Sequence, residues 1–208
     1  MDKIIPTYKP VGLSSFDLIR RYKRENDFKG KIGHGGTLDP FACGLVLLLL
    51  GKATKEFDEI KKWDKTYLAG LRLGATSTTG DPSGEVAVTL ESKNSKTTKA
   101  QIEKVIKGII GEIDQQIPAY SAAKQDGTPF YKLARQGKKT PERSKKVNIK
   151  SIELVTYKYP FLTLRVTASG GTYIRQLAQD IGKQLGIGAY LYYLERQVIG
   201  KFTKKEIE

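Results

Sequence analysis

The chain has 208 residues, and its 36 lysines and arginines against 22 acidic residues give a formal net charge of +14. One cysteine and one histidine exclude an intramolecular disulfide framework and the metal centres built from several Cys or His ligands. An excess of positive charge this large indicates a polyanionic partner, with nucleic acid ahead of a membrane surface.

The predicted elements of the first half begin with a short strand over 1–10. Ser14 and Asp17 stand three residues apart and predict the N-terminal cap of a helix. Residues 30–44 are rich in glycine and are predicted as a loop, and the apolar run 45–50 after it is typical of a buried strand. This run is the longest in the chain and far too short for a membrane span, so none is expected. A helix over 53–61, a strand over 67–73, a polar turn over 74–84 and a strand over 85–90 follow.

The second half alternates helices and strands. Apolar residues at 102, 105, 106 and 109 share one helical face, and a short helix is predicted over 129–136. Strands over 149–157 and 161–168 are expected to pair, and a helix over 172–185 is expected to end at Gly186 and Gly188. No internal repeat and no clear domain boundary is visible. The closest candidate is 137–150, which carries a net charge of +5.

The glycine-rich segment 33–40 places Asp39 at the tip of a loop just before the apolar strand. The aspartate could simply cap backbone amides in an Asp-Pro turn. So many glycines also indicate a backbone that approaches another molecule closely, which in a basic chain would be a nucleotide. Neither nucleotide-binding motif is complete, because Ala53 stands where a P-loop requires Ser or Thr and Leu38 stands where GxGxxG requires its third glycine.

Residues 33–55 read GHGGTLDPFACGLVLLLLGKATK and resemble the catalytic signature of the TruB family of tRNA pseudouridine synthases. Further blocks resemble family motifs in the same order along the chain: 8–15, 64–67, 116–124 with 131–137, 170–175 and 188–194. The resemblance implies an α+β fold, the pseudouridine-synthase catalytic fold, with a mixed and mostly antiparallel sheet flanked by helices and an RNA-binding cleft. It also implies that a specific uridine in the TΨC loop of tRNA is isomerised to pseudouridine.

By resemblance, Asp39 matches the essential carboxylate, Arg175 the arginine that pairs with it, and Tyr67 the aromatic residue stacked on the target base. Whether Asp39 attacks the base, attacks the sugar or acts as a base stays open. Arg175 could instead bind a phosphate, and Tyr67 could be an ordinary core residue. His34 matches a histidine that contacts the RNA as the uridine flips out, although it could merely fix the glycine loop. Further substrate-binding or RNA-binding residues are predicted at Lys9, Tyr173, Leu194, Lys138, Lys139, Lys145 and Lys146.

The resemblance implies a reaction without metal or cofactor and the T arm of tRNA as partner. The short apolar runs and the N-terminus without a signal-peptide segment predict no membrane and a cytoplasmic protein, and we expect a monomer. Residues 1–208 are predicted as one catalytic domain, without the C-terminal PUA domain that the family usually carries. A catalytically silent RNA-binding module and a synthase acting on another RNA remain as alternatives. One departure from the family pattern, at 77–79, leaves any role of Thr78 in doubt.

Overall fold

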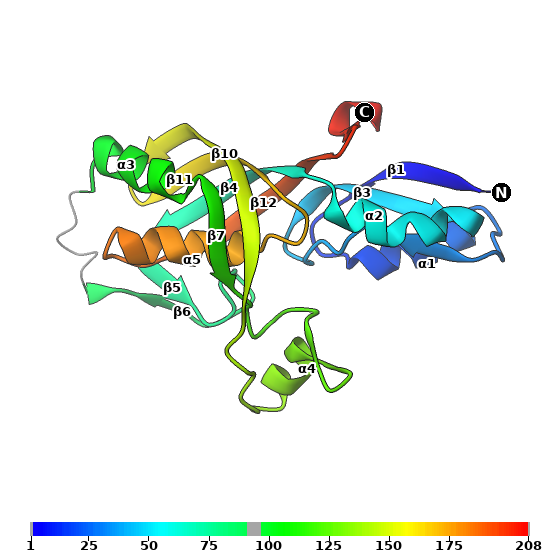
Figure 1. Cartoon of the computed structure of the whole chain (residues 1–208), viewed down its shortest axis with the longest axis horizontal. Coiled ribbons are helices and arrows are strands. Elements are labelled where there is room, and N and C mark those ends of the chain that lie inside the picture. Colours follow the sequence, from blue (N-terminus) through cyan, green and yellow to red (C-terminus); the bar gives the residue numbers. More distant parts are fainter. Residues whose placement is uncertain (1, 91–96, 208) are drawn as a thin grey trace.

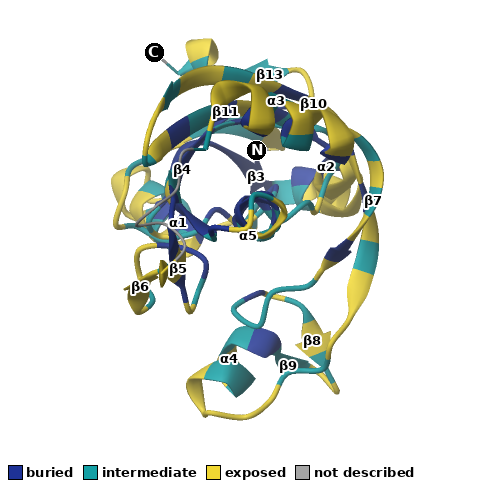
Figure 2. Cartoon of the chain, turned by 90° about the vertical axis from the view of Figure 1, so that its left-hand side faces the viewer, coloured by how far each residue is buried: buried dark blue, intermediate teal, exposed yellow. Residues whose placement is uncertain are grey.

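The structure is a computed structural model that describes residues 2–90 and 97–207, and it is built on one strongly curved sheet (Figures 1 and 2). The main path across this sheet is β1 (Lys3–Lys9), β3 (Cys43–Leu50), β12 (Ala189–Ile199), β4 (Lys65–Leu73), β11 (Phe161–Ala168), β10 (Ser144–Lys158) and β7 (Gly111–Gln116). Two short strands add to it: β2 (Ile32–His34) pairs with β3, and β13 (Phe202–Thr203) pairs with β12. Among the described strands only β3 and β12 pair in parallel. The predicted mixed, mostly antiparallel sheet is therefore confirmed.

The helices cover this sheet unequally. Figure 2 shows α5 (Ile174–Gln184) inside the curve formed by β4, β11, β10 and β7. Leu177 and Ile181 of α5 and Ile106 of α3 (Lys99–Ile109) pack with the sheet in the main hydrophobic core. α1 (Ser15–Glu25) begins at the predicted cap, where the Ser14 hydroxyl accepts a hydrogen bond from the Asp17 N–H and the Asp17 carboxylate accepts one from the Ser14 N–H.

β3 is buried along its whole length because its two faces pack on different clusters. The side chains at 46, 48 and 50 join the main core, while those at 45, 47 and 49 join a second cluster with Ile60 of α2 (Phe57–Lys62) and Ile199 of β12. A strand buried on both faces appears in a sequence as a continuous apolar run instead of an alternating one. This rigid strand anchors the loop that carries Asp39.

Residues 117–143, called the lobe below, project from the end of β7 and return to β10 (Figures 1 and 2). The lobe contains α4 (Phe130–Arg135) and a two-stranded sheet of β8 (Lys124–Gln125) and β9 (Thr128–Pro129). Phe130 is fully buried. The short helix predicted over 129–136 is confirmed.

The structure corrects several of the predicted elements. The helix expected over 53–61 is a 3₁₀-helix, η1 (Gly51–Glu56), followed by α2. The loop expected over 30–44 contains β2, and the strand expected over 85–90 shrinks to β6 (Val86–Val88), which pairs with β5 (Ala75–Ser77). The strand expected over 1–10 is β1, with residue 1 outside the described residues. The sequence predicts neither β7 nor β12, and a further 3₁₀-helix, η3 (Lys204–Glu206), follows β13.

Candidate active site

Asp39 lies in the loop between β2 and β3, and contacts from the start of α1 fix the residues on both sides of it. The Ser15 hydroxyl accepts a hydrogen bond from the Leu38 N–H (2.8 Å) and donates one to the Leu38 carbonyl (3.3 Å). The Gly12 N–H donates to the Pro40 carbonyl (2.8 Å). The segment 12–15 therefore holds the Asp39 loop from one side.

Arg196 of β12 holds the same loop from the other side. Its guanidinium donates hydrogen bonds to the carbonyl oxygens of Leu45 (2.7 Å), Gly36 (3.1 Å) and Thr37 (3.3 Å), and the residue is only 2% exposed. β12 can approach this closely because it faces Gly44, where a Cβ would lie 2.3 Å from the Arg196 carbonyl oxygen and where φ is +111°. No sequence motif predicted this role for Arg196.

The structure brings Arg175, in the first turn of α5, onto the Asp39 carboxylate. Arg175 Nε lies 2.9 Å from Asp39 Oδ2, and Nη2 lies 3.4 Å from Oδ1, so the guanidinium faces the carboxylate as a fork. The arginine side chain is 9% exposed and the aspartate side chain 32% exposed. The charged pair is thus shielded on the arginine side, while the carboxylate stays open to a substrate.

Three more acceptors fix the guanidinium of Arg175. Nη1 lies 3.3 Å from Asp81 Oδ2 and donates to the Thr79 carbonyl (2.9 Å). Nη2 donates to the Tyr120 carbonyl (2.7 Å). Arg175 therefore connects Asp39 to the turn before β6 and to the first residues of the lobe, and the orientation of the fork depends on both.

The pKa of the Asp39 carboxyl reflects opposing influences. Burial raises this pKa above the ordinary value for aspartate, the charges of Arg175 and Lys9 lower it, and the charge of Asp81 raises it. The net result is a pKa above the ordinary value, so burial disfavours the ionised form and the two neighbouring cations limit that effect. A carboxylate in this setting can act as a nucleophile or as a base.

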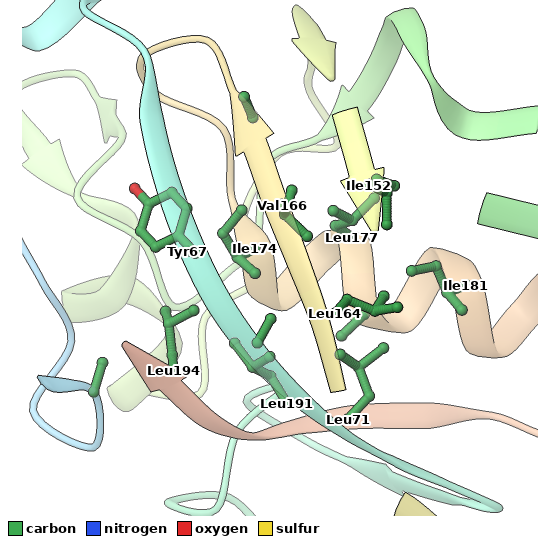
Figure 3. Packing of buried hydrophobic residues seen from close by; sticks show 14 of the residues in the cluster. Tyr67, Leu71, Ile152, Leu164, Val166, Ile174, Leu177, Ile181, Leu191 and Leu194 are labelled. Atoms are coloured by element: carbon green, nitrogen blue, oxygen red, sulfur yellow. The ribbon is translucent and has the colours of Figure 1, made fainter. Parts of the chain in front are cut away.

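Tyr67 of β4 and Leu194 of β12 form an apolar wall close to Asp39. Figure 3 shows both side chains with Ile174 of α5 at the end of the core cluster, and the Tyr67 hydroxyl points away from the labelled core side chains. Burial raises the pKa of this hydroxyl, while the charge and a hydrogen bond of Arg196, its partner across the strands, lower it. Tyr67 is 8% and Leu194 4% exposed, so the wall belongs to the edge of the main core, with the Tyr67 hydroxyl on the side of Asp39 and Arg196.

His34 lies at the end of β2 and is half-buried. Its Nδ1 accepts a hydrogen bond from the Gly36 N–H (3.4 Å). Burial lowers the pKa of His34, and the positive charge of Arg196 lowers it further. The hydrogen bond between His34 and Gly36 helps to fix the glycine loop. The contact of His34 with RNA stays a prediction.

Lys9 is fully buried, so it has no surface for the RNA contact predicted from its motif. Its ammonium donates to the carbonyl oxygens of Leu13 (2.7 Å), Pro10 (2.9 Å) and Pro40 (3.5 Å). Burial lowers the pKa of Lys9 to about 8. The side chain therefore positions the loop of Asp39 from inside the protein.

Gln115 of β7 fixes the start of α5. Its side-chain amide donates to the Tyr173 carbonyl (3.0 Å) and accepts from the Tyr173 N–H (2.8 Å), and the residue is fully buried. Tyr173 is the N-cap of α5 but makes no side-chain capping bond. Gln115 therefore orders the backbone two residues before Arg175, and sequence reasoning missed it because a lone glutamine carries no recognisable signal.

The predicted RNA-binding lysines fall into two groups. The Lys145 ammonium lies 4.1 Å from the centre of the Tyr173 ring, so these two predicted RNA-binding side chains contact each other. Lys146 forms an exposed ion pair of 2.8 Å with Glu112 of β7. Lys138 and Lys139 lie exposed in the lobe, just after α4. Among the described residues, Lys138 and Lys139 have no ion pair or ring contact of the kind that Lys145 and Lys146 make.

No group of three or more His, Cys, Asp or Glu side chains within residues 2–90 and 97–207 is placed to hold a metal ion. Cys43, at the start of β3, is a buried free thiol. The helices of the described part of the chain are all too short or too polar to cross a membrane.

Known proteins resemble this chain in sequence. Residues 21–174 match the sequence model of the N-terminal domain of the TruB family pseudouridylate synthases. The chain is 44% identical over 203 residues to the tRNA pseudouridine synthase B of Burkholderia pseudomallei (strain 668), a match that covers 98% of this chain and 66% of that protein. The chain thus spans slightly less than two thirds of the length of this curated relative.

Solved structures resemble it in fold. A chain of a Cbf5-Nop10-Gar1 complex matches with a TM-score of 0.75 at 28% identity, over 98% of this chain and 50% of that one. A chain of an H/ACA RNP bound to a substrate RNA containing 2′-deoxyuridine matches with a TM-score of 0.71 at 26% identity, over 98% of this chain and 49% of that one.

Proposed function

The chain belongs to the TruB family of pseudouridylate synthases and has their α+β catalytic fold, and from this membership we propose that it converts one uridine of tRNA to pseudouridine. The proposed target is a uridine in the TΨC loop, presented on the T arm. Residues 1–208 act as one catalytic domain, as a monomer in the cytoplasm and without a metal or cofactor.

The reaction breaks the bond between N1 of uracil and C1′ of the ribose, rotates the base, and joins C5 to C1′. C5 then loses its proton and N1 gains one. Atoms and electrons balance within the nucleotide, so the enzyme has to supply only a carboxylate, a surface that holds the detached base, and a route for the proton.

The fork between Arg175 and Asp39, next to the wall of Tyr67 and Leu194, carries this proposal. An ionised carboxylate is required whether Asp39 attacks the base, attacks the sugar or removes a proton from the sugar. The guanidinium stabilises that ionised form and fixes its direction. A uridine must leave the folded RNA loop to reach it, and the apolar wall suits the flat face of a flipped uracil.

We assign to the Tyr67 hydroxyl a part in removing the proton from C5 after the base has rotated. Burial keeps the hydroxyl protonated, so its oxygen takes the C5 proton as its own proton leaves to solvent water, which also supplies the proton that N1 gains. Arg196 stabilises any negative charge on the oxygen during this exchange. Tyr67→Phe retains the ring and removes the hydroxyl together with its hydrogen bond to Arg196.

RNA binding is assigned to the exposed lysines of the lobe and to His34. Phosphate contacts position the RNA and make binding salt-dependent. Replacing Lys138 and Lys139 together by alanine should raise KM for a T-arm stem-loop and reduce the slope of log KM against log salt by up to about two. Replacing Lys145 and Lys146 should change that slope less, because both already have partners.

Tritium release from C5-labelled uridine in unmodified tRNA measures the reaction directly. Asp39→Asn keeps the shape of the side chain and removes its charge, so the rate should fall by at least about a thousandfold. Asp58→Asn, at an exposed position of α2, is the matched control and should leave the rate unchanged. Tritium release by Asp39→Asn at a rate near that of the control would refute the assignment of Asp39.

A synthase acting on another RNA is the second candidate, since a chain of an H/ACA RNP bound to a substrate RNA shares this fold. The two candidate functions are distinguished by measuring tritium release from three labelled RNAs: whole tRNA, its isolated T arm and an unrelated uridine-containing stem-loop. Release from the unrelated stem-loop alone would favour the second candidate, and RNA binding without any release would favour a silent RNA-binding module.

A further inference from the structure

An aromatic side chain lies exposed on the face of the sheet that points away from α5. Leu71 and Leu191 are cross-strand partners and lie in the main core with Ile181 of α5 (Figure 3). Successive side chains of a strand point to opposite faces, so Arg72 and its cross-strand partner Phe161 point to the outer face. Phe161 is 48% exposed, so the outer face presents an aromatic ring to its surroundings.

Tyr192 of β12 adds a second ring. It stands where the register of β12 against β4 shifts, between Leu191 and Tyr193, and its ring centre lies 5.3 Å from that of Phe161. β4 runs between these two strands and leaves room for the ring at Gly70, where a Cβ would lie 2.8 Å from Tyr192 Cζ. Tyr192 is 37% exposed. Phe161 and Tyr192, called the outer aromatic pair below, therefore form one surface across three adjacent strands.

Two cations lie beside the outer aromatic pair. Arg72 of β4 and Lys158 of β10 are the cross-strand neighbours of Phe161 on its two sides. Lys158 is exposed and Arg72 is half-buried. Within residues 2–90 and 97–207 neither side chain forms an ion pair or a hydrogen bond. The outer face therefore offers two free positive charges next to its rings.

The acidic residues of the same strands do not cancel these charges. β4, β10, β11 and β12 contain two of them, Glu153 and Glu195. Glu153 forms an ion pair of 2.7 Å with Arg165, and Glu195 one of 3.0 Å with a lysine beyond β13. Since both carboxylates are paired, the outer face attracts a polyanion, in agreement with the net charge of +14 of the whole chain.

Flat rings beside free cations suit a single-stranded nucleic acid. Every base has a face that stacks on an aromatic side chain, and every phosphate carries a charge for a lysine or an arginine. RNA-binding sheets present aromatic side chains on an open face and stack two or three unpaired bases on them. A second copy of this chain would bring the same positive charges to the face, which disfavours self-association.

We infer that the outer face of the sheet binds single-stranded RNA, with bases stacked on Phe161 and Tyr192 and the adjoining phosphates held by Arg72 and Lys158. This surface is separate from the Asp39 site. Arg72 lies five residues along β4 from Tyr67, which is about 17 Å in a strand, and the two side chains belong to opposite faces. The inference therefore does not depend on the proposed reaction.

Fluorescence anisotropy with a labelled, unstructured RNA of about ten nucleotides tests the surface. Excess unlabelled T-arm stem-loop occupies the Asp39 site during the measurement. Phe161→Leu combined with Tyr192→Leu keeps both side chains apolar and removes the flat rings. Phe161→Tyr combined with Tyr192→Phe retains the rings and is the matched control. The leucine pair should raise Kd at least about tenfold, because two stacked bases lose their platform, and the control should leave Kd unchanged.

Arg72→Gln combined with Lys158→Gln tests the charges without touching the rings. Each phosphate contact to a single strand contributes about 0.7 to the slope of log Kd against log salt, so this variant should reduce the slope by about 1.4. An unchanged slope, or a leucine pair that binds as tightly as its control, would overturn the inference. A wild type that binds no unstructured RNA would overturn it as well.

Sedimentation velocity covers the remaining occupant, since a dimer of the wild type that the leucine pair abolishes would show that a second copy covers the face and would overturn the inference. Tritium release from the T arm should be the same in all these variants, so failure of the surface leaves the proposed function intact. A KM for whole tRNA that rises in the leucine pair identifies an unpaired part of the tRNA as the strand bound there. An unchanged KM, with the weaker binding of the unstructured RNA, identifies a separate RNA.

Discussion

Replacing Arg196 by lysine tests whether the Asp39 loop is held from β12. The guanidinium makes three hydrogen bonds to carbonyl oxygens in two segments of chain, at 2.7, 3.1 and 3.3 Å. A lysine ammonium is a single point charge and can replace about one of them. The positive charge is retained, so the change isolates the geometry of the contact.

The expected loss follows from burial. Arg196 is 2% exposed, so water does not compensate for the two lost bonds. Hydrogen bonds to a charged group contribute about 1.5–3 kcal/mol each, and the lower value applies because one of these bonds is long, giving a loss of about 3 kcal/mol. For a domain of this size that corresponds to a fall in Tm of about 6–12 °C. Release of Gly36 and Thr37 should also displace Asp39, and a displacement of about 1 Å lowers kcat about a hundredfold.

Differential scanning fluorimetry and tritium release at a temperature well below Tm measure the two effects separately. Arg165→Lys is the matched control, since Arg165 forms a surface ion pair of 2.7 Å with Glu153 and such pairs contribute about 1 kcal/mol or less. A Tm and kcat for Arg196→Lys no lower than those of Arg165→Lys would refute the reasoning. A lowered Tm with unchanged kcat would show that Arg196 stabilises the fold without positioning Asp39.

Three further predictions concern the same site. The NMR titration of His34 should give a pKa below the ordinary histidine value, so the stability of the fold should fall as the pH drops below about 6.5. Arg196→Gln should raise the pKa of His34 because it removes a positive charge, and an unchanged pKa in this variant would contradict the influence of Arg196. The acidic limb of the pH–rate profile should lie above the ordinary aspartate pKa, and Asp81→Asn should move it to lower pH because a charge that raises the pKa of Asp39 is lost; a shift to higher pH would contradict this. Gln115→Glu loses the donor to the Tyr173 carbonyl and should lower kcat more than KM changes, with Gln115→Ala worse still; equal kcat in all three proteins would exclude a positioning role.

Strong local signals made part of the fold predictable. The continuous apolar run identified β3 because both of its faces are buried, and the Ser14–Asp17 pair identified the start of α1 because a capping box uses only neighbouring residues. The site residues on three distant segments became predictable only through the family resemblance. The ion pair between Arg175 and Asp39 joins positions 136 residues apart, which no local pattern can indicate.

β12 was not predictable for a physical reason. Its register shifts twice against β4, between 191 and 193 and between 196 and 198, so the alternation expected of a strand is interrupted. It also buries two charged residues, Glu195 and Arg196, where a central strand would normally carry apolar side chains. The first is neutralised by Lys204 at 3.0 Å and the second by backbone carbonyls, and both partners lie on other elements.

Lys9, Gln115 and Arg196 show why the residues that hold the candidate site in place could not be predicted from the sequence. Each is buried, and each bonds to backbone groups next to Asp39 or Arg175. A catalytic carboxylate requires Asp or Glu, so the sequence can indicate it. A backbone carbonyl is present in every residue, so the sequence does not indicate which carbonyl a buried side chain binds. Lysine, glutamine and arginine are residue types expected at the protein surface, yet here they are buried and hold the backbone next to Asp39 and Arg175. A substitution that preserves their charge but alters their hydrogen-bond geometry should therefore affect catalysis as strongly as one that removes a charge near the substrate.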